Sequence, residues 1–359
     1  MDPGFSATFT WDVDLLSGYD SEFVPNLSRR PGAGSFFGFR NPTLAAQLAA
    51  WEPDSLLVFG YNSVSHIRSI IWAKRRGIRL IFRGDSHLLG RGGMPPVKRF
   101  VLTRLYSAFD AMLFVGNANR EYFKYLGVPD GRLYFAPHSV NASQFDPAGA
   151  GVRVAAERWR IEIGVAPAER VVLFAGKFLP AKQPLELLRA YCTAPRPGWV
   201  LIFVGSGTEE EALRRAAAES PAGCRVLVLP FANQSEMPSR YLASELFVLP
   251  SKGHYETWGL AVNEAMHMGI PCLVSDLVGC QRDLVADGET GWVFDPDKNG
   301  ALANSLGSAL DALSNGDQRE RIKSAARERI SHYGYAEAAN GLERALSGEA
   351  AGKLHETCG

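Results

Sequence analysis

Runs of consecutive apolar residues recur along the second half of the chain. They are RVVLFAG (170–176), WVLIFVG (199–205), CRVLVLPF (224–231), ELFVLPS (245–251) and PCLVSD (271–276). Helix-like segments such as PLELLRAYC (184–192) separate them. Continuous apolar runs predict strands that are buried on both faces. Their alternation with helices predicts a parallel sheet covered by helices on both sides.

The first half repeats this pattern more loosely. Its apolar runs are SLLVFG (55–60), IRLIFRG (78–84), AMLFVG (111–116) and RLYFAP (132–137). Between the halves, residues 146–170 mix proline, glycine and charges without a clear strand, which favours a domain boundary there. We therefore expect an α/β protein with two Rossmann-like domains, residues 1–160 and 165–331. Ligands of such sheets bind outside the carboxyl ends of the strands, so a cleft between the domains should hold the site.

Composition narrows the class of protein. The 359 residues contain 38 Lys plus Arg and 38 Asp plus Glu, so no overall charge attracts nucleic acid. No apolar run approaches the ~18 residues of a membrane-spanning helix, and the first residues lack a signal-peptide pattern. The cysteines are odd in number and scattered: Cys192, Cys224, Cys272, Cys280 and Cys358. This distribution predicts free, mostly packed thiols in a reducing cytoplasm.

Two lysines and two glycines follow predicted strands. Lys177 and Lys182 lie in the loop after 170–176, and Pro184 suits the first turn of the next helix. Ammonium groups beside a helix N-terminus favour a diphosphate, although two solvated surface lysines would give the same spacing. Gly205 and Gly207 form a GxG, but a dinucleotide-binding fingerprint needs a third glycine where Glu210 stands. The GxG is either a turn that lets backbone approach a ligand or a plain strand-to-helix turn.

Two glutamates stand eight residues apart in ETWGLAVNE, a segment that continues into an apolar helix-like run. If Glu256 begins this helix and Glu264 lies within it, they are ~12 Å apart along the axis and about 80° apart around it. Both would face one cleft and suit the two ends of a sugar nucleotide. Backbone amides at the helix start would point towards the phosphates, and a glycine there allows close approach. The residues concerned are Thr257, Trp258, Gly259 and Leu260. A purely structural glutamate pair remains the alternative.

These motifs together resemble the family 4 retaining glycosyltransferases of GT-B fold. GKFLPAKQP, VGSG, LFVLPSKGHYETWGLAVNEAMHMGIPCLVSD and GETGWVF occur in the family's order over about residues 170–295. The resemblance implies that Lys177 and Lys182 bind the donor diphosphate, that Glu256 contacts the donor sugar, and that Glu264 binds the ribose. It also implies that Phe231 lies near the base. A C-terminal helix over 332–347 would complete the N-terminal, acceptor-side domain.

The activity implied by this resemblance is transfer of a sugar from a nucleotide-sugar donor, with a UDP-sugar as the commonest donor. The acceptor would be a saccharide, a lipid-linked or a small molecule, as in polysaccharide biosynthesis. Lys177, Lys182 and Glu256 would be the catalytic residues. Retention is generally attributed to front-face attack, in which the leaving phosphate takes the acceptor proton, so neither a metal nor a cofactor is expected.

The first half matches the family less closely. FRGDSHLL (82–89) falls where many relatives carry a loop histidine near the reacting sugar, which makes Arg83, Asp85 and His87 candidate acceptor-side residues. A lone loop histidine more often has a structural role, which is the alternative here. Relatives usually open with a strand and a glycine-rich loop, which this chain is expected to lack. The DVD at 12–14 is interpreted as a solvated loop and not as a metal-binding motif.

Alternatives follow from the same features. A shortened chain would bind a sugar nucleotide without transferring sugar, and a GT-B epimerase or hydrolase would share the donor residues. A Rossmann oxidoreductase would rest on VGSG alone. VKRFVLTRLYSAF (97–109) predicts either a basic amphipathic helix in peripheral contact with the inner face of a membrane, or a core-facing helix with its basic residues outward.

Overall fold

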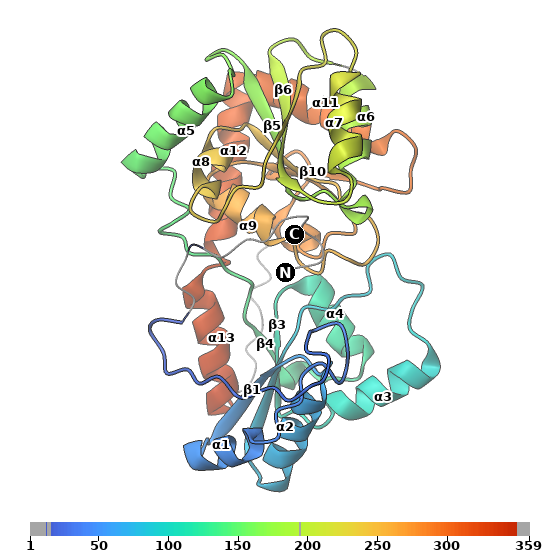
Figure 1. Ribbon diagram of the computed structural model, residues 1–359, viewed down its shortest axis with the longest axis vertical. Helices are drawn as coiled ribbons and strands as arrows, with labels where there is room; N and C mark the ends of the chain where they lie inside the picture. Colours follow the sequence, from blue (N-terminus) through green and yellow to red (C-terminus); the bar gives the residue numbers. More distant parts are fainter. Residues whose placement is uncertain (1–11, 13–15, 194, 350–359) are drawn as a thin grey trace. The chain divides into compact units, whose positions relative to one another are not determined.

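The computed structural model describes residues 12, 16–193 and 195–349, which form two compact units (Figure 1). The first unit contains residues 16–88, 92–137 and 336–349. The second contains residues 12, 89–91 and 138–335, apart from 194. Residues 138–160 therefore lie with the second unit, whereas the sequence analysis assigned them to the first. The helix of this segment, α5 (Ala150–Glu162), packs against α8 (Met237–Leu242) of the second unit.

In the described part of the first unit, four parallel strands form a sheet of order β1-β2-β3-β4. They are β1 (Ser55–Phe59), β2 (Arg79–Arg83), β3 (Ala111–Phe114) and β4 (Leu133–Phe135). Each lies within an apolar run that predicted it. The helices are α1 (Leu44–Trp51), α2 (Val64–Arg75), α3 (Pro96–Tyr106), α4 (Asn117–Tyr125) and α13 (Tyr335–Ser347).

Both faces of this sheet are covered. On one face Phe82 of β2 packs against Tyr106 of α3 and Phe123 of α4, with ring centroids 5.0 and 6.0 Å away. On the other face Ile81 belongs to a cluster with Ala345 of α13. A Cβ on Gly341 would lie 1.8 Å from the Phe135 carbonyl oxygen, so α13 rests directly on the backbone of β4.

The second unit has a larger sheet. Its described residues form six parallel strands in the order β10-β9-β8-β5-β6-β7. The strands are β5 (Arg170–Lys177), β6 (Trp199–Ser206), β7 (Val226–Leu229), β8 (Leu246–Leu249), β9 (Cys272–Ser275) and β10 (Gly291–Phe294). Besides α5 and α8, its helices are α6 (Pro184–Thr193), α7 (Glu210–Ala218), α9 (Leu260–His267), α10 (Gln281–Leu284), α11 (Ala301–Ser314) and α12 (Gly316–Ser331). None of the helices described in either unit has both the length and the apolar character needed to cross a membrane.

The apolar runs are continuous because helices cover both faces of this sheet. Every residue of β6 is buried, and alternate side chains point to opposite faces. Phe174 and Phe203 belong to the cluster under α6, α7 and α11. On the opposite face Phe247 of β8 packs against Tyr241 of α8, with ring centroids 5.5 Å apart. The predicted parallel sheet with two covered faces is confirmed.

The sequence pattern did not predict two elements, one helix and one strand. The segment between the halves contains helix α5, whose only buried residues are Ala156 and Trp159. So small a buried face gives little helical periodicity in the sequence. The strand β10 has four residues and begins with Gly291, whose Cβ would lie 2.1 Å from the Cys272 carbonyl oxygen. The motif GETGWVF therefore contains a sheet edge that packs closely on β9.

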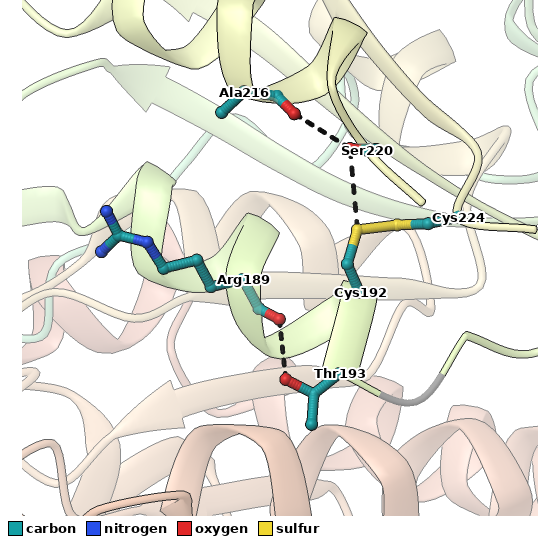
Figure 2. Close-up of a disulfide and its surroundings, with 6 residues drawn as sticks. All are labelled: Arg189, Cys192, Thr193, Ala216, Ser220 and Cys224. Atoms are coloured by element: carbon teal, nitrogen blue, oxygen red, sulfur yellow. Dashed lines mark hydrogen bonds between the residues drawn. A yellow bond between two sulfur atoms is a disulfide. The ribbon is translucent and has the colours of Figure 1, made fainter. Parts of the chain in front are cut away.

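The expectation of free thiols is wrong for two cysteines. Cys192, in the last turn of α6, forms a disulfide with Cys224, which precedes β7 (Figure 2). Their Cα atoms are 5.5 Å apart, and Ser220 Oγ lies 3.8 Å from Cys192 Sγ. A separation of 32 residues gives no sequence signal for this pairing. Such bonds are rare in cytosolic proteins, so the pair weakens the composition argument for a cytoplasmic location. Cys272 and Cys280 are free and buried, and Cys358 lies outside the described residues.

Reduction of this disulfide is expected to lower the free energy of unfolding. Closing a loop of 32 residues restricts the unfolded chain, and this loss of chain entropy corresponds to about 4 kcal/mol. Denaturant unfolding with and without dithiothreitol measures the effect as a shift of the transition midpoint. Cys192→Ser/Cys224→Ser is the control. Its transition midpoint should equal that of the reduced wild type and should not change when dithiothreitol is added. Equal midpoints for oxidised and reduced wild type would contradict this expectation.

Candidate active site

The carboxyl ends of β5 and β6 lie side by side in register, which pairs Lys177 with Ser206. Gly205 and Gly207 flank Ser206 with φ values of 155° and 157°. A Cβ on Gly205 would lie 1.9 Å from the Gly176 carbonyl oxygen, and one on Gly207 would lie 2.4 Å from that of Phe178. The GxG therefore serves the close packing of two backbone segments. This packing accounts for both glycines without a ligand.

The loop after β5 is tied to the loop after β8. It contains a single 3-10 turn, Pro180–Lys182, followed by Gln183 in the left-handed conformation at φ 53°. The Lys252 amide donates a hydrogen bond of 2.8 Å to the Ala181 carbonyl oxygen. This bond fixes two strand-end loops relative to each other at the same edge of the sheet.

Lys182 and Glu256 form an ion pair across these two loops, through Nζ and Oε2. Both side chains are largely buried, with exposed fractions of 14% and 15%. Ser251 Oγ donates to the same carboxylate oxygen at 3.3 Å, and the Lys182 ammonium lies 5.9 Å from the ring centroid of Tyr255. Because an ammonium group has three donors, Lys182 can bind an anion while it stays paired with Glu256.

The expectation that Glu256 begins a helix is wrong. Helix α9 begins at Leu260, after Gly259 at φ 101°, and Glu256 lies in the preceding loop. The left-handed conformation of Gly259 separates the loop from the helix, so the 12 Å spacing and 80° angle do not apply. A Cβ on Gly259 would lie 3.0 Å from Val278 and 3.1 Å from Leu249, so this glycine is required by interior packing.

The other residues of this loop have distinct environments. Trp258 is buried, and its indole Nε1 donates a hydrogen bond of 2.8 Å to Asn263 Oδ1. Its side chain therefore stabilises the turn into α9. Thr257 is half-buried, and the Leu260 side chain is exposed. The backbone amides of these residues and the Thr257 hydroxyl are the groups that could donate hydrogen bonds to an anion before α9.

Glu264, in the middle of α9, has two partners within the protein. Tyr241 Oη donates to Oε2 at 2.7 Å, and Gln234 Nε2 donates to Oε1 at 3.0 Å. Burial raises the pKa of this carboxyl group, and the hydrogen bonds from Gln234 and Tyr241 act in the opposite direction. A carboxylate accepts about four hydrogen bonds, so these two donors leave room for further ones.

A cavity of about 190 Å³ opens beside Glu264. It lies at the carboxyl ends of β5 and β6, next to α8 and α9. Its walls are mostly apolar, and Glu264 supplies the one ionisable acid among them. The lining residues are Ala175, Gly176, Val204, Phe231, Ala232, Gln234, Met237, Tyr241, Ala261 and Glu264. An apolar slot with one carboxylate suits a flat, partly apolar ring that carries hydroxyl groups.

Tyr241 and Gln234 are site residues that the sequence analysis missed. The apolar surroundings of Glu264 imply that the carboxylate needs a hydrogen-bond donor. Tyr241 lies in α8, 23 residues before Glu264 in the sequence. Gln234 lies ahead of α8, 30 residues before Glu264. Local sequence patterns cannot identify such a partner, because the pairing depends on how α8 packs against α9.

The candidate acceptor-side residues lie in the first unit. Arg83, at the end of β2, donates to the carbonyl oxygens of Ala136 and Pro137 at 2.8 and 3.1 Å. Burial lowers the pKa of this guanidinium, and the nearby Asp85 carboxylate opposes the shift. His87 is buried, with 3% of its surface exposed. Arg83 thus holds the chain that leaves β4, whatever further role these residues have.

Most of the opening segment lies outside the described residues. Asp14 of the DVD and residues 1–11 lie outside the described residues. Asp12 is described, and its carboxylate contacts the Ser235 hydroxyl. Within the described ranges no group of three or more His, Cys, Asp or Glu side chains could hold a metal ion.

Comparisons with known proteins agree with this geometry. The family model described as Glycosyl transferases group 1 matches residues 155–329. A D-inositol 3-phosphate glycosyltransferase from Nocardia farcinica is 31% identical over 354 residues, which cover 89% of this chain and 75% of the relative. A second relative, from Mycolicibacterium smegmatis, is a GDP-mannose-dependent alpha-(1-6)-phosphatidylinositol monomannoside mannosyltransferase. It is 28% identical over 247 residues, which cover 66% of this chain and 63% of the relative.

Solved structures give the same fold. A glycosyltransferase from Rickettsia africae has a TM-score of 0.71 at 15% identity, covering 85% of this chain and 79% of that one. Anabaena HepE, in complex with UDP and glucose, has a TM-score of 0.67 at 20% identity, and the match covers 85% of this chain and 81% of that one. Together with the two parallel sheets, these similarities define the GT-B fold of glycosyltransferases. By the family match and the Nocardia relative, the chain belongs to the group 1 glycosyltransferases, which confirms the resemblance read from its motifs.

Proposed function

We propose that this glycosyltransferase moves a sugar from a UDP-sugar to a hydroxyl group of a saccharide, lipid-linked or small-molecule acceptor, with retention and without a metal ion. The observation that carries this proposal is the apolar cavity beside Glu264, in the same unit as the Lys182–Glu256 pair. One site of this unit thus offers a slot for a base, a carboxylate for a ribose and a cation for a diphosphate.

Each part of the donor has a proposed partner. The base would enter the cavity beside Phe231, and the ribose hydroxyls would donate to Glu264 alongside Tyr241 and Gln234. The diphosphate would lie against Lys177 and Lys182 and the first amides of α9, where the helix dipole also favours an anion. Glu256 would accept hydrogen bonds from the donor sugar.

The bond changes of the proposed reaction are simple. The bond between the anomeric carbon and the phosphate oxygen breaks, and the acceptor oxygen bonds to the same face of that carbon. The acceptor proton passes to the leaving phosphate oxygen, so the scheme uses no protein base. Charge grows on the diphosphate in the transition state, and the cations that face it supply the main stabilisation.

The names of the relatives bear on the donor and the acceptor. The Anabaena structure holds UDP and glucose, whereas the Mycolicibacterium relative is named for GDP-mannose. The Nocardia relative is named for D-inositol 3-phosphate, and the Mycolicibacterium relative is named for phosphatidylinositol monomannoside. A UDP-sugar and a hydroxyl-rich acceptor are the proposal for this chain, and GDP-mannose is the competing donor.

Calorimetric titration tests the donor part of the proposal. UDP-glucose, UDP, GDP-mannose and GDP are titrated into the full chain in the presence of EDTA. We expect UDP and UDP-glucose to bind in the chelator, with GDP and GDP-mannose much weaker. Preference for GDP-mannose would overturn the donor assignment, and binding only after a divalent cation is added would overturn metal independence.

The transfer step has its own test. With the donor identified, NMR of the product formed on a panel of inositol and sugar acceptors reports the anomeric configuration. The same configuration as in the donor supports retention, and the opposite one contradicts it. Tight donor binding with neither transfer nor hydrolysis would favour a sugar-nucleotide-binding protein without transferase activity.

A further inference from the structure

Helix α3 of the first unit has apolar residues on two opposite sides. Leu102 and Tyr106 are buried in the core of the unit. Val97, Phe100 and Val101 are 76%, 68% and 55% exposed. Residues spaced i, i+3 and i+4 share one side of a helix, so these three form one continuous outward face. Figure 1 shows α3 on the outside of the unit.

Basic residues surround this outward face. The chain carries no Asp or Glu between Asp85 and Asp110, whereas α3 carries Lys98, Arg99 and Arg104. Arg104 lies two turns after Val97, on the same side. Of the three, Arg99 is engaged by the protein, with its guanidinium 4.3 Å from the Tyr125 ring centroid. In the part of the chain that the structure describes, the side chains of Lys98 and Arg104 form no hydrogen bond or ion pair.

The sequence left open whether this helix contacts a membrane or turns only basic residues outward. The helix does face the core through Leu102 and Tyr106, but its outward side carries exposed apolar residues as well as basic ones. The helix is also firmly anchored. Tyr106 is buried among Phe82, Tyr122 and Phe123, with ring centroids 5.0, 6.4 and 5.6 Å away. The surface is therefore preformed and does not require the helix to move.

We propose that the outward face of α3 docks on an anionic phospholipid bilayer. Val97, Phe100 and Val101 would enter the boundary between headgroups and acyl chains, with the helix lying in the membrane plane. Lys98 and Arg104 would bind headgroup phosphates. A second copy of the chain is the poorer occupant, because a two-fold interface through this face sets Lys98 and Arg104 against like charges. This inference does not rest on the proposed donor or reaction.

Co-sedimentation with vesicles tests the proposal. The full chain is mixed with vesicles of phosphatidylcholine alone, or with roughly one third phosphatidylglycerol added, at low and at physiological salt. The test variant is Val97→Ser/Phe100→Ser/Val101→Ser. Its matched control is Val154→Ser/Ile161→Ser on α5, where the original side chains are 56% and 77% exposed. All the substituted side chains are solvent-exposed, so thermal unfolding midpoints should stay close to wild type.

We expect the wild type to bind the anionic vesicles and to bind more weakly as salt is raised. The triple variant should lose at least about ten-fold in affinity, and the α5 control should match wild type. A second variant, Lys98→Ala/Arg104→Ala, should lose about thirty-fold at low salt, since each basic residue near an anionic surface contributes about 1 kcal/mol.

Three results would overturn the proposal. The first is absence of wild-type binding to anionic vesicles. The second is undiminished binding by the triple variant. The third is a wild-type dimer, seen by light scattering, that the triple variant converts to a monomer; this would assign the face to a second copy of the chain.

Discussion

Replacing Lys182 with alanine is expected to lower kcat by about 10²–10³-fold. The ammonium group of this lysine would face the diphosphate as its charge grows, and the carboxylate of Glu256 holds it in place. The lost interaction strengthens in the transition state, so kcat should fall more than the donor Kd rises. Initial rates under saturating donor, with a calorimetric Kd for the same variant, separate the two effects.

The removal of Lys182 also leaves Glu256 without its partner in a largely buried position. The thermal unfolding midpoint of Lys182→Ala measures this side effect separately from turnover, because an unpaired buried carboxylate lowers stability whether or not the lysine is catalytic. Lys298→Ala removes an exposed lysine that pairs with Asp295 in the same unit and should leave kcat unchanged. A Lys182→Ala enzyme with near-normal turnover would refute the catalytic assignment of Lys182.

Replacing Glu264 with glutamine is expected to weaken UDP binding by about 10–100-fold, because hydrogen bonds to a charged acceptor contribute about 1.5–3 kcal/mol. The substitution keeps the size of the side chain and removes its charge. Tyr241→Phe is the matched control, since it deletes one donor to the same carboxylate and keeps the ring. The control should bind UDP better than Glu264→Gln. If both variants bind UDP as wild type does, the ribose site lies elsewhere.

The same substitution has a signature in the pH dependence of stability. Burial raises the pKa of Glu264, so the native state holds its proton more tightly than the unfolded state. The free energy of unfolding must then fall as pH rises from the ordinary range of a glutamate through the raised pKa. Unfolding midpoints of wild type should show this slope, and those of Glu264→Gln should show less of it.

The strands of both units could be predicted because a strand buried on both faces carries its own signal. All eight residues of β6 are buried, and its sequence is correspondingly apolar throughout. The positions of the lysines and glutamates relative to these strands followed from the same pattern and from the family resemblance. Local periodicity and strand-end loops are thus recoverable from sequence alone.

Contacts between distant segments were not recoverable. The start of α9 was placed too early because the left-handed conformation of Gly259 breaks the helical pattern in a way that residue types do not reveal. The donors to Glu264 and the disulfide partner of Cys192 depend on how separate elements pack. The sequence could not decide which apolar residues of α3 face the core, because burial is set by neighbouring elements and not by hydropathy alone.

The packing of α13 on the first sheet has a consequence for biosynthesis. Ile81, Leu113 and Tyr134 lie on one side of that sheet, and Ala345, which covers them, is translated only after the second unit. The strands of the first unit therefore emerge from the ribosome before most of the second unit, but the core of the first unit is completed only after the second unit has been synthesised. In the interval an apolar sheet surface stays uncovered, and a chaperone can bind it. An N-terminal fragment that omits α13 would keep that surface permanently and would be prone to aggregate.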